Sequence, residues 1–306
     1  MHPLRDTILW ASGNPTLRRR LPRLWFVRKT VNKFMPGETA EDALAAAQRL
    51  GADGIPTTFT VLGENVTDLS QATAATGEYL RMLDRIAETG VDSEVSVKLT
   101  QLGFDLDPEH TAMQVTRLAE RSKGLGKTVW IDIESTGYVD GTLDLYEGLL
   151  KEGHDVGLCI QAYLKRTWDD IQRLLPHRPS IRLVKGAYKE SAEHVFTDKR
   201  LIDEAYLRIA TNLVNDPDGR VRRTVLGTHD VDLVARIERE LGPGAKHRFE
   251  LAMLYGIRSD DQLRYARDGY TIRTLISYGD YWYPWFMRRI AEKPVTNSLL
   301  ALRNLV

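Results

Sequence analysis

Short apolar runs alternate with longer amphipathic segments from about residue 55 onward. The runs are rich in β-branched residues and lack internal proline, which is typical of buried parallel strands. Eight runs fit this description: 58–62, 95–99, 129–133, 156–160, 181–184, 224–226, 247–253 and 270–276.

The segments between these runs carry apolar residues at helical spacing. The pattern predicts one helix over 70–89, ending before Gly90, and another over 108–124, with Asp107 as its N-cap. Residues 203–214 and 259–267 show the same spacing. Strands that alternate with helices in this way predict an α/β fold, a (β/α)8 TIM-type barrel. A doubly wound sheet is the alternative, but it normally needs fewer strands, and no G-x-G-x-x-G fingerprint follows any run.

The start of the chain differs from the rest. Residues 1–45 predict an N-terminal helical extension, and 46–306 predict one barrel domain that carries the catalytic site. Residues 18–33 hold seven basic residues with apolar residues among them, a composition that can bind an anionic membrane surface. We favour the simpler interpretation, an ordinary helical cap over the core.

Composition narrows the class of protein. The 306 residues hold 42 basic and 42 acidic side chains, so no global field points to nucleic acid. The single cysteine, Cys159, forms no intrachain disulfide and suggests a reducing compartment. No run approaches the roughly 18 apolar residues of a membrane helix, and the N-terminus has no signal-peptide core. We expect a cytoplasmic protein, with peripheral contact at the inner face of the membrane as the alternative. A homo-oligomer is compatible with the sequence.

Polar and charged residues recur at the C-terminal ends of the predicted strands, where barrel enzymes place their active sites. Charges inside strands are costly unless paired, so their recurrence favours function over scaffold. The set includes Lys98, Asp132, Glu134, Gln161, Tyr163, Arg166, Arg182, Lys185, Gly186, Tyr188, Thr228, His229, Asp230 and Glu250.

Three smaller groups suggest particular chemistry. Lys98 and Asp132 lie on neighbouring predicted strands, so we expect a direct ion pair between them. The loops that begin at Lys185 and at Gly227 combine glycine with a cation or an imidazole and suit a phosphate group. Asp132, Glu134 and His229 could also bind a metal, but no compact spacing supports such a site, and none is expected.

Two adjacent arginines, Arg288 and Arg289, follow a run of aromatic residues near the end of the chain. Guanidinium groups bind carboxylates in bidentate fashion, so this pair suggests a site for a small carboxylic acid with an apolar body. A solvated pair at the end of a helix is the alternative for the doublet alone.

These motifs together resemble the proline dehydrogenases, from about residue 61 to 294. The likeness rests on Lys98, Asp132, the run 182–188, Gly227-Thr228-His229, Phe249-Glu250, Tyr278-Gly279, Trp282-Tyr283-Pro284 and the run 288–292. The chain length resembles the monofunctional bacterial branch of this family.

The resemblance implies an FAD-dependent barrel enzyme that oxidises L-proline to Δ1-pyrroline-5-carboxylate and passes electrons to a membrane quinone. It implies catalytic roles for Lys98, Asp132, Arg182 and Tyr188, with Arg182 beside the flavin N5. It implies a substrate site formed by Arg288 and Arg289 as the carboxylate clamp, with Glu292, Leu254 and Leu275. It implies FAD contacts from Gln161, Arg182, Lys185, Gly186, Ala187, Thr228 and His229.

Two residues depart from the family pattern. Leu275 stands where the family usually has a tyrosine, and Ala252 stands where it usually has a glutamine. Leucine keeps apolar bulk but lacks the flat aromatic face and the hydroxyl. A substituted or N-alkylated proline, or another cyclic or secondary amino acid, is therefore the alternative substrate, with proline favoured.

Functions of other classes remain open at this stage. A barrel lyase or aldolase could use Lys98 or Lys185 as a Schiff base. A carboxylate-binding protein without catalysis is a third hypothesis, which the spread of polar groups over many strand ends disfavours.

Overall fold

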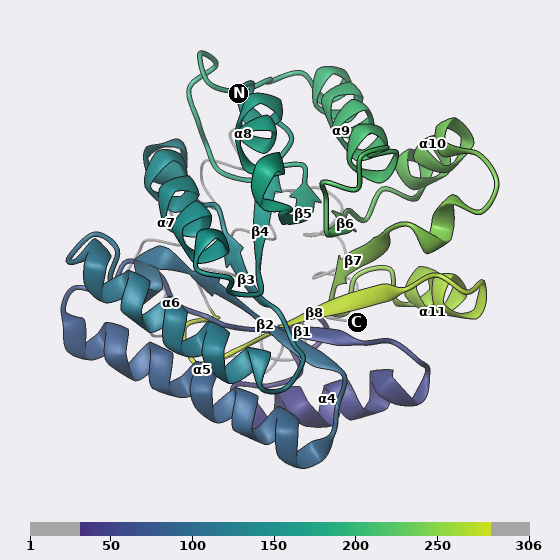
Figure 1. Ribbon diagram of the computed structural model, residues 1–306. Helices are drawn as coiled ribbons and strands as arrows, with labels where there is room; N and C mark the ends of the chain where they lie inside the picture. Colours follow the sequence, from purple (N-terminus) through teal and green to yellow (C-terminus); the bar gives the residue numbers. More distant parts are fainter. Residues whose placement is uncertain (1–30, 283–306) are drawn as a thin grey trace, which may run out of the picture.

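The computed structural model describes residues 31–282. Within them, eight parallel strands form one closed barrel in sequence order, with helices around the outside (Figure 1). The strands are β1 Thr57–Val61, β2 Ser93–Lys98, β3 Val129–Asp132, β4 Val156–Gln161, β5 Ser180–Val184, β6 Arg223–Gly227, β7 Glu250–Leu254 and β8 Ile272–Tyr278. The predicted (β/α)8 barrel is thus confirmed.

One helix precedes the first strand, the others each follow a strand, and together they cover the barrel. They are α4 Ala40–Ala52, α5 Leu69–Thr89, α6 Pro108–Lys123, α7 Val139–Lys151, α8 Thr167–Leu174, α9 Lys199–Val214, α10 Val231–Leu241 and α11 Ser259–Arg267. Within residues 31–282, no helix is long and apolar enough to cross a bilayer. The expected boundary between 1–45 and 46–306 falls inside α4, and it stays a prediction.

Local capping chemistry sets the ends of the helices that the sequence predicted best. Helix α5 begins after Asp68, whose carboxylate accepts from the Gln71 amide at 3.0 Å, and it ends at Gly90 with φ 68°. Helix α6 begins after Asp107, which accepts from the His110 amide at 2.9 Å. Both caps satisfy backbone groups that a helix end leaves unpaired.

Two predicted boundaries were wrong by three residues or more. Strand β7 begins at Glu250 and not at 247, because Ala245–His247 form a 3-10 turn after the left-handed Gly244. Helix α9 begins at Lys199 and not at 203, because Asp198 caps it through the Arg200 amide at 2.7 Å. In both places a turn residue outside the apolar pattern sets the boundary.

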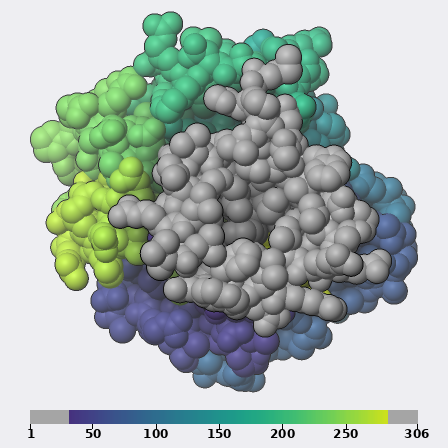
Figure 2. All heavy atoms as spheres, turned by 180° about the vertical axis from the view of Figure 1, so that it is seen from behind, coloured from purple at the N-terminus to yellow at the C-terminus, as the bar shows by residue number. Residues whose placement is uncertain are grey.

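The barrel closes where the last strand pairs with the first. The register joins Thr57 to Thr274 and Val61 to Tyr278. Helix α4 packs against β8 as well as β1, so the first and last described elements lie together. In the space-filling view, the purple surface of the first described elements adjoins the yellow surface of the last ones (Figure 2).

Side chains alternate between the helix layer and the barrel interior. On β2, Val95 and Val97 are fully buried among apolar residues of the core. Glu94 alternates with them and bonds Arg223 on β6, which a β2 side chain can reach only through the interior. The interior is therefore polar, which explains the charges that recur from strand to strand.

Candidate active site

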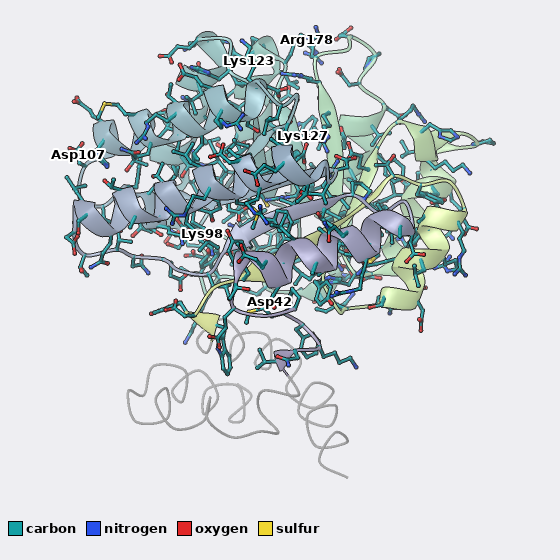
Figure 3. All side chains as sticks on the ribbon, turned by 90° about the horizontal axis from the view of Figure 1, so that it is seen from below. Asp42, Lys98, Asp107, Lys123, Lys127 and Arg178 are labelled. Atoms are coloured by element: carbon teal, nitrogen blue, oxygen red, sulfur yellow. The ribbon has the colours of Figure 1, made fainter. Side chains whose placement is uncertain are left out.

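Two ends of the barrel carry different residues. Lys98 lies toward one end, where β2 finishes, whereas Lys127 and Arg178, which precede β3 and β5, lie at the other (Figure 3). The predicted site residues belong to the end with Lys98. This is the C-terminal face on which barrel enzymes build their sites.

One level of the interior aligns three predicted site residues, Lys98, Asp132 and Arg182, together with Cys159. The register pairs Lys98 with Asp132, Asp132 with Cys159, and Cys159 with Arg182. Buried Arg182 donates to the Asp132 carboxylate at 2.5 Å and to the Ser96 hydroxyl at 2.7 Å. This geometry fixes a cation just below the mouth of the barrel.

The expected ion pair between Lys98 and Asp132 is absent from the described part of the chain. Asp132 binds Arg182 instead. The guanidinium reaches it across β4, which offers no side chain at Gly157 and only a small one at Cys159. A planar fork of donors also suits a carboxylate better than an ammonium does.

Lys98 has a second acidic neighbour, Glu134. Burial raises the pKa of Glu134, and hydrogen bonds from Thr100 together with the charge of Lys98 offset this only in part. The Thr100 amide donates to this carboxyl at 3.1 Å and the Thr100 hydroxyl at 2.8 Å. The mouth therefore holds a titratable acid that the set of catalytic candidates did not include.

Gln161 ends β4 with one unsatisfied atom. Its amide nitrogen donates to the carbonyls of Ile133 at 2.9 Å and Glu134 at 2.8 Å, which fixes the orientation of the group. Its Oε1 is buried and has no hydrogen-bond partner among the described residues. A buried acceptor without a partner is costly and indicates a donor from elsewhere.

Gly186 follows β5 and packs against an aromatic ring. Its φ is 110°, and a Cβ there would lie 2.2 Å from Tyr163 Cδ1. Only glycine fits such a position. The neighbouring Ala187 is exposed and Tyr188 is half-buried, so both lie at the surface of this mouth.

Lys185, which the sequence suggested for a phosphate contact, is held by two carboxylates. Its Nζ donates to Asp203 at 2.5 Å and to Asp230 at 2.8 Å. Lys199 also bonds Asp203. Burial alone would raise the pKa of Asp203, but Lys185 and Lys199 hold it below its usual value. A lysine whose nitrogen is held by two carboxylates is poorly placed to attack a carbonyl, which disfavours Lys185 as a Schiff-base nucleophile.

Thr228 and His229 lie at the end of β6. The Thr228 hydroxyl accepts from the Asp230 amide at 3.1 Å. His229 Nε2 accepts from the Leu254 amide at 2.9 Å, so this nitrogen carries no proton. In the neutral ring the proton therefore lies on Nδ1.

An apolar wall completes the mouth. Leu254 on β7 and Leu275 on β8 are register partners, and both are partly exposed. Ala252 pairs with Gly227 on one side and Arg273 on the other. These side chains are small or flexible, so the wall has no aromatic face at these positions.

A cluster of four charges lies deeper in the barrel, and the sequence reasoning named only one of its members. Arg223 bonds Glu94 and Glu250, each at 2.5 Å. Arg273 lies 3.4 Å from Glu94 and 3.5 Å from Glu250. Two of the missed residues share a strand face with a recognised one: Glu94 lies four positions before Lys98, and Arg273 lies two positions before Leu275. The strand period of two was therefore the signal that could have found them.

Several predicted features lie outside the residues that the structure describes. Arg288, Arg289 and Glu292 fall beyond residues 31–282, so the carboxylate clamp stays a prediction, as does most of the basic segment 18–33. Within the described range, no three His, Cys, Asp or Glu residues are grouped to hold a metal.

Comparison with known proteins gives consistent results. A model of the proline dehydrogenase family matches residues 43–299. Proline dehydrogenase 1 of Bacillus subtilis subsp. natto is 35% identical over 309 residues, covering 99% of each chain. The proline dehydrogenase of Deinococcus radiodurans is 34% identical and covers 95% of this chain and 94% of its own.

Solved structures show the same fold. Proline utilization A from Bdellovibrio bacteriovorus superposes with a TM-score of 0.79 at 21% identity, covering 94% of this chain and 36% of that one. A variant of proline utilization A from Bradyrhizobium japonicum gives a TM-score of 0.72 at 26% identity. The chain spans about a third of these longer proteins, covering 36% and 31% of them.

Proposed function

Because the chain belongs to the proline dehydrogenase family, we propose that it is an FAD-dependent enzyme that oxidises L-proline to Δ1-pyrroline-5-carboxylate. The observation that carries this proposal is the buried Arg182, held by Asp132 and Ser96 at the mouth of the barrel. A guanidinium fixed there stabilises negative charge that develops above it during a redox step.

The residues of the mouth fit a flavin. The unpaired Gln161 Oε1 is an acceptor that an N–H group of the isoalloxazine would satisfy. The close approach of backbone at Gly186, with exposed Ala187, leaves main-chain groups available to a ligand. We assign FAD contacts to Gln161, Arg182, Lys185, Gly186, Ala187, Thr228 and His229, with Lys185 shared with its two carboxylates. When bound, a flavin supplies the two-electron acceptor.

The other site residues bind and orient the substrate. Arg288 and Arg289 would hold its carboxylate, supported by Glu292, while Leu254, Leu275 and Tyr188 pack beside its ring. Oxidation removes a hydride from the ring carbon and a proton from nitrogen as a C=N bond forms, so the amine must first be neutral. Lys98 and the Asp132–Arg182 pair form the polar wall beside this nitrogen. Holding the reacting atoms in line lowers the barrier.

The final electron acceptor would be a quinone at the inner face of the membrane, reached from the cytoplasm. The basic segment 18–33 is the candidate contact for an anionic surface. Detergent-free sedimentation with anionic vesicles would test this contact.

A second substrate class is favoured by the apolar wall. Leu275 lies beside Leu254, and Ala252 adds no side-chain amide, so the pocket is roomier and less polar than one lined by tyrosine and glutamine. A substituted or N-alkylated proline, or another cyclic or secondary amino acid, would fit such a wall. A panel of proline, hydroxyproline, N-methylproline and pipecolate separates the two, since clearly faster turnover of proline would contradict the alternative.

A visible spectrum tests the proposed function first. The protein purified in air should be yellow and absorb blue light, and proline should bleach it without oxygen. A colourless protein, trapped by borohydride together with a carbonyl compound, would instead indicate a Schiff-base lyase. Tight carboxylate binding without dye reduction would indicate a non-catalytic role.

A further inference from the structure

Trp130 occupies the interior directly below the mouth. It lies on β3 between Ser96 and Gly157 in the register, and it is 1% exposed. The guanidinium carbon of Arg182 lies 5.0 Å from the centre of its ring, and that of Arg223 lies 5.3 Å away. One indole thus contacts the cation of the mouth and a cation of the deeper cluster.

The indole is also fixed at its nitrogen. Nε1 donates to Glu94 Oε2 at 2.8 Å, and the same carboxylate is held by Arg223 and lies near Arg273. The donor of a buried tryptophan normally needs such a partner. The orientation of the ring is therefore set by the four-charge cluster.

Strand β4 supplies the space for the ring. A Cβ at Gly157 would lie 2.4 Å from Trp130 Cε3 and 2.6 Å from Cζ3. Real side chains do not approach so closely, so an alanine at 157 would displace the ring. Glycine is needed here for room, because its backbone has no unusual φ.

We propose that Trp130 is a positioning residue that holds the face of the Arg182 guanidinium, and so sets its place beside the flavin. The inference rests on the proposed function. Asp132 and Ser96 bind the Arg182 guanidinium through hydrogen bonds from its Nη2 atom. The Trp130 ring lies under the guanidinium carbon and limits movement of the guanidinium toward the ring. A planar cation needs both constraints to stay in one position. A desolvated cation–π contact is strong enough to matter for this purpose.

Substitution of the ring should change the electron affinity of the flavin. A guanidinium close to the isoalloxazine raises its midpoint potential, because it favours the electron-rich form. Trp130→Leu should therefore lower the potential and slow flavin reduction by proline about tenfold. Trp130→Phe keeps an aromatic face and should lose roughly threefold. KM for proline should change less than twofold, since the proposed carboxylate clamp is untouched.

A matched control uses the tryptophan of α8. Trp168 lies on α8 and packs against the core, and none of the contacts described for Arg182 involves it, so Trp168→Phe removes an indole and leaves those contacts in place. It should leave the midpoint potential and the reduction rate unchanged. Both quantities are measured per bound flavin, so a loss of folded protein does not imitate the effect.

Gly157→Ala gives a test that leaves the indole in place. The added methyl should displace the ring and reproduce the lowered potential. In a Trp130→Phe background the smaller ring leaves room, so the same substitution should have less than half that effect. If Trp130→Leu does not fold, Trp130→Phe and this double-mutant cycle still test whether Trp130 positions Arg182.

Two results would overturn the inference. The first is a midpoint potential equal to that of the unchanged protein in both Trp130→Phe and Gly157→Ala. The second is that the changes in midpoint potential caused by Trp130→Phe and Gly157→Ala simply add in the double variant. A colourless unchanged protein would contradict the proposed function itself, and the inference with it, before any variant is made.

Discussion

Leu275 is the residue through which we propose that the pocket selects its substrate. It faces the mouth beside Leu254, where the family usually has a tyrosine. A leucine fills part of the same volume but gives no flat surface for a ring to pack on.

Restoring the aromatic residue should therefore narrow the pocket. We expect Leu275→Tyr to raise the ratio of kcat/KM for proline over that for N-methylproline about tenfold, a change typical of filled pocket volume. Steady-state kinetics with both substrates measure this ratio. Leu275→Met keeps apolar bulk and is the control. An unchanged ratio in the tyrosine variant would show that this position does not select the substrate.

Individual partners were the least predictable part of the site. Lys98 and Asp132 do lie on neighbouring strands at one level, as expected, yet Arg182 takes the carboxylate. Strand order follows from the sequence pattern, but the reach of a side chain depends on the sizes of the residues between. Here Cys159 on β4 is small enough to let Arg182 across.

Helix ends, in contrast, followed from local chemistry. Asp68 and Asp107 cap α5 and α6, and Gly90 ends α5 in the left-handed conformation. Such signals depend on a few adjacent residues, which the sequence displays directly. The predicted start of β7 was wrong because His247 belongs to the 3-10 turn Ala245–His247 that follows Gly244, and the strand begins only at Glu250.

Two glycines, one at the end of α5 and one inside α7, test how backbone conformation affects helix stability. Gly90 has φ 68° with open space around it, so Gly90→Ala should lower the free energy of unfolding by about 1 kcal/mol. Gly148 lies inside α7, also in open space, so Gly148→Ala should raise it by up to about 1 kcal/mol. Urea unfolding of both variants measures the changes. Destabilisation by both would mean that backbone conformation does not decide the sign.

At the scale of the molecule, the four-charge cluster joins strands that are distant around the ring. Glu94 on β2 binds Arg223 on β6 and lies near Arg273 on β8. Burial alone would raise the pKa of Glu94, but Arg273 and Arg223 hold it below its usual value near 4.5. A carboxyl with a lowered pKa stabilises the fold above pH about 4.5 and loses that contribution as the pH falls through its folded value.

The acid sensitivity of the protein should therefore depend on Glu94. We expect Glu94→Gln to cost about 3 kcal/mol at pH 7, because it removes one of the two carboxylates that Arg223 and Arg273 share inside the barrel. Its unfolding free energy should then fall less steeply than that of the unchanged protein below pH about 4.5. Glu88→Gln, at an exposed pair on α5, should change stability by under about 0.5 kcal/mol. Parallel acid profiles for Glu94→Gln and the unchanged protein would contradict this role.

The closing contact between β1 and β8 has a consequence for synthesis in the cell. Thr57 on β1 can pair with Thr274 on β8 only after Thr274 has left the ribosome. Until then a nascent chain presents two open sheet edges, on β1 and on the latest strand, and such edges invite association with other chains. A chain that stops before β8 would keep both edges, so premature termination should yield aggregates and chaperone substrates, with no smaller working barrel.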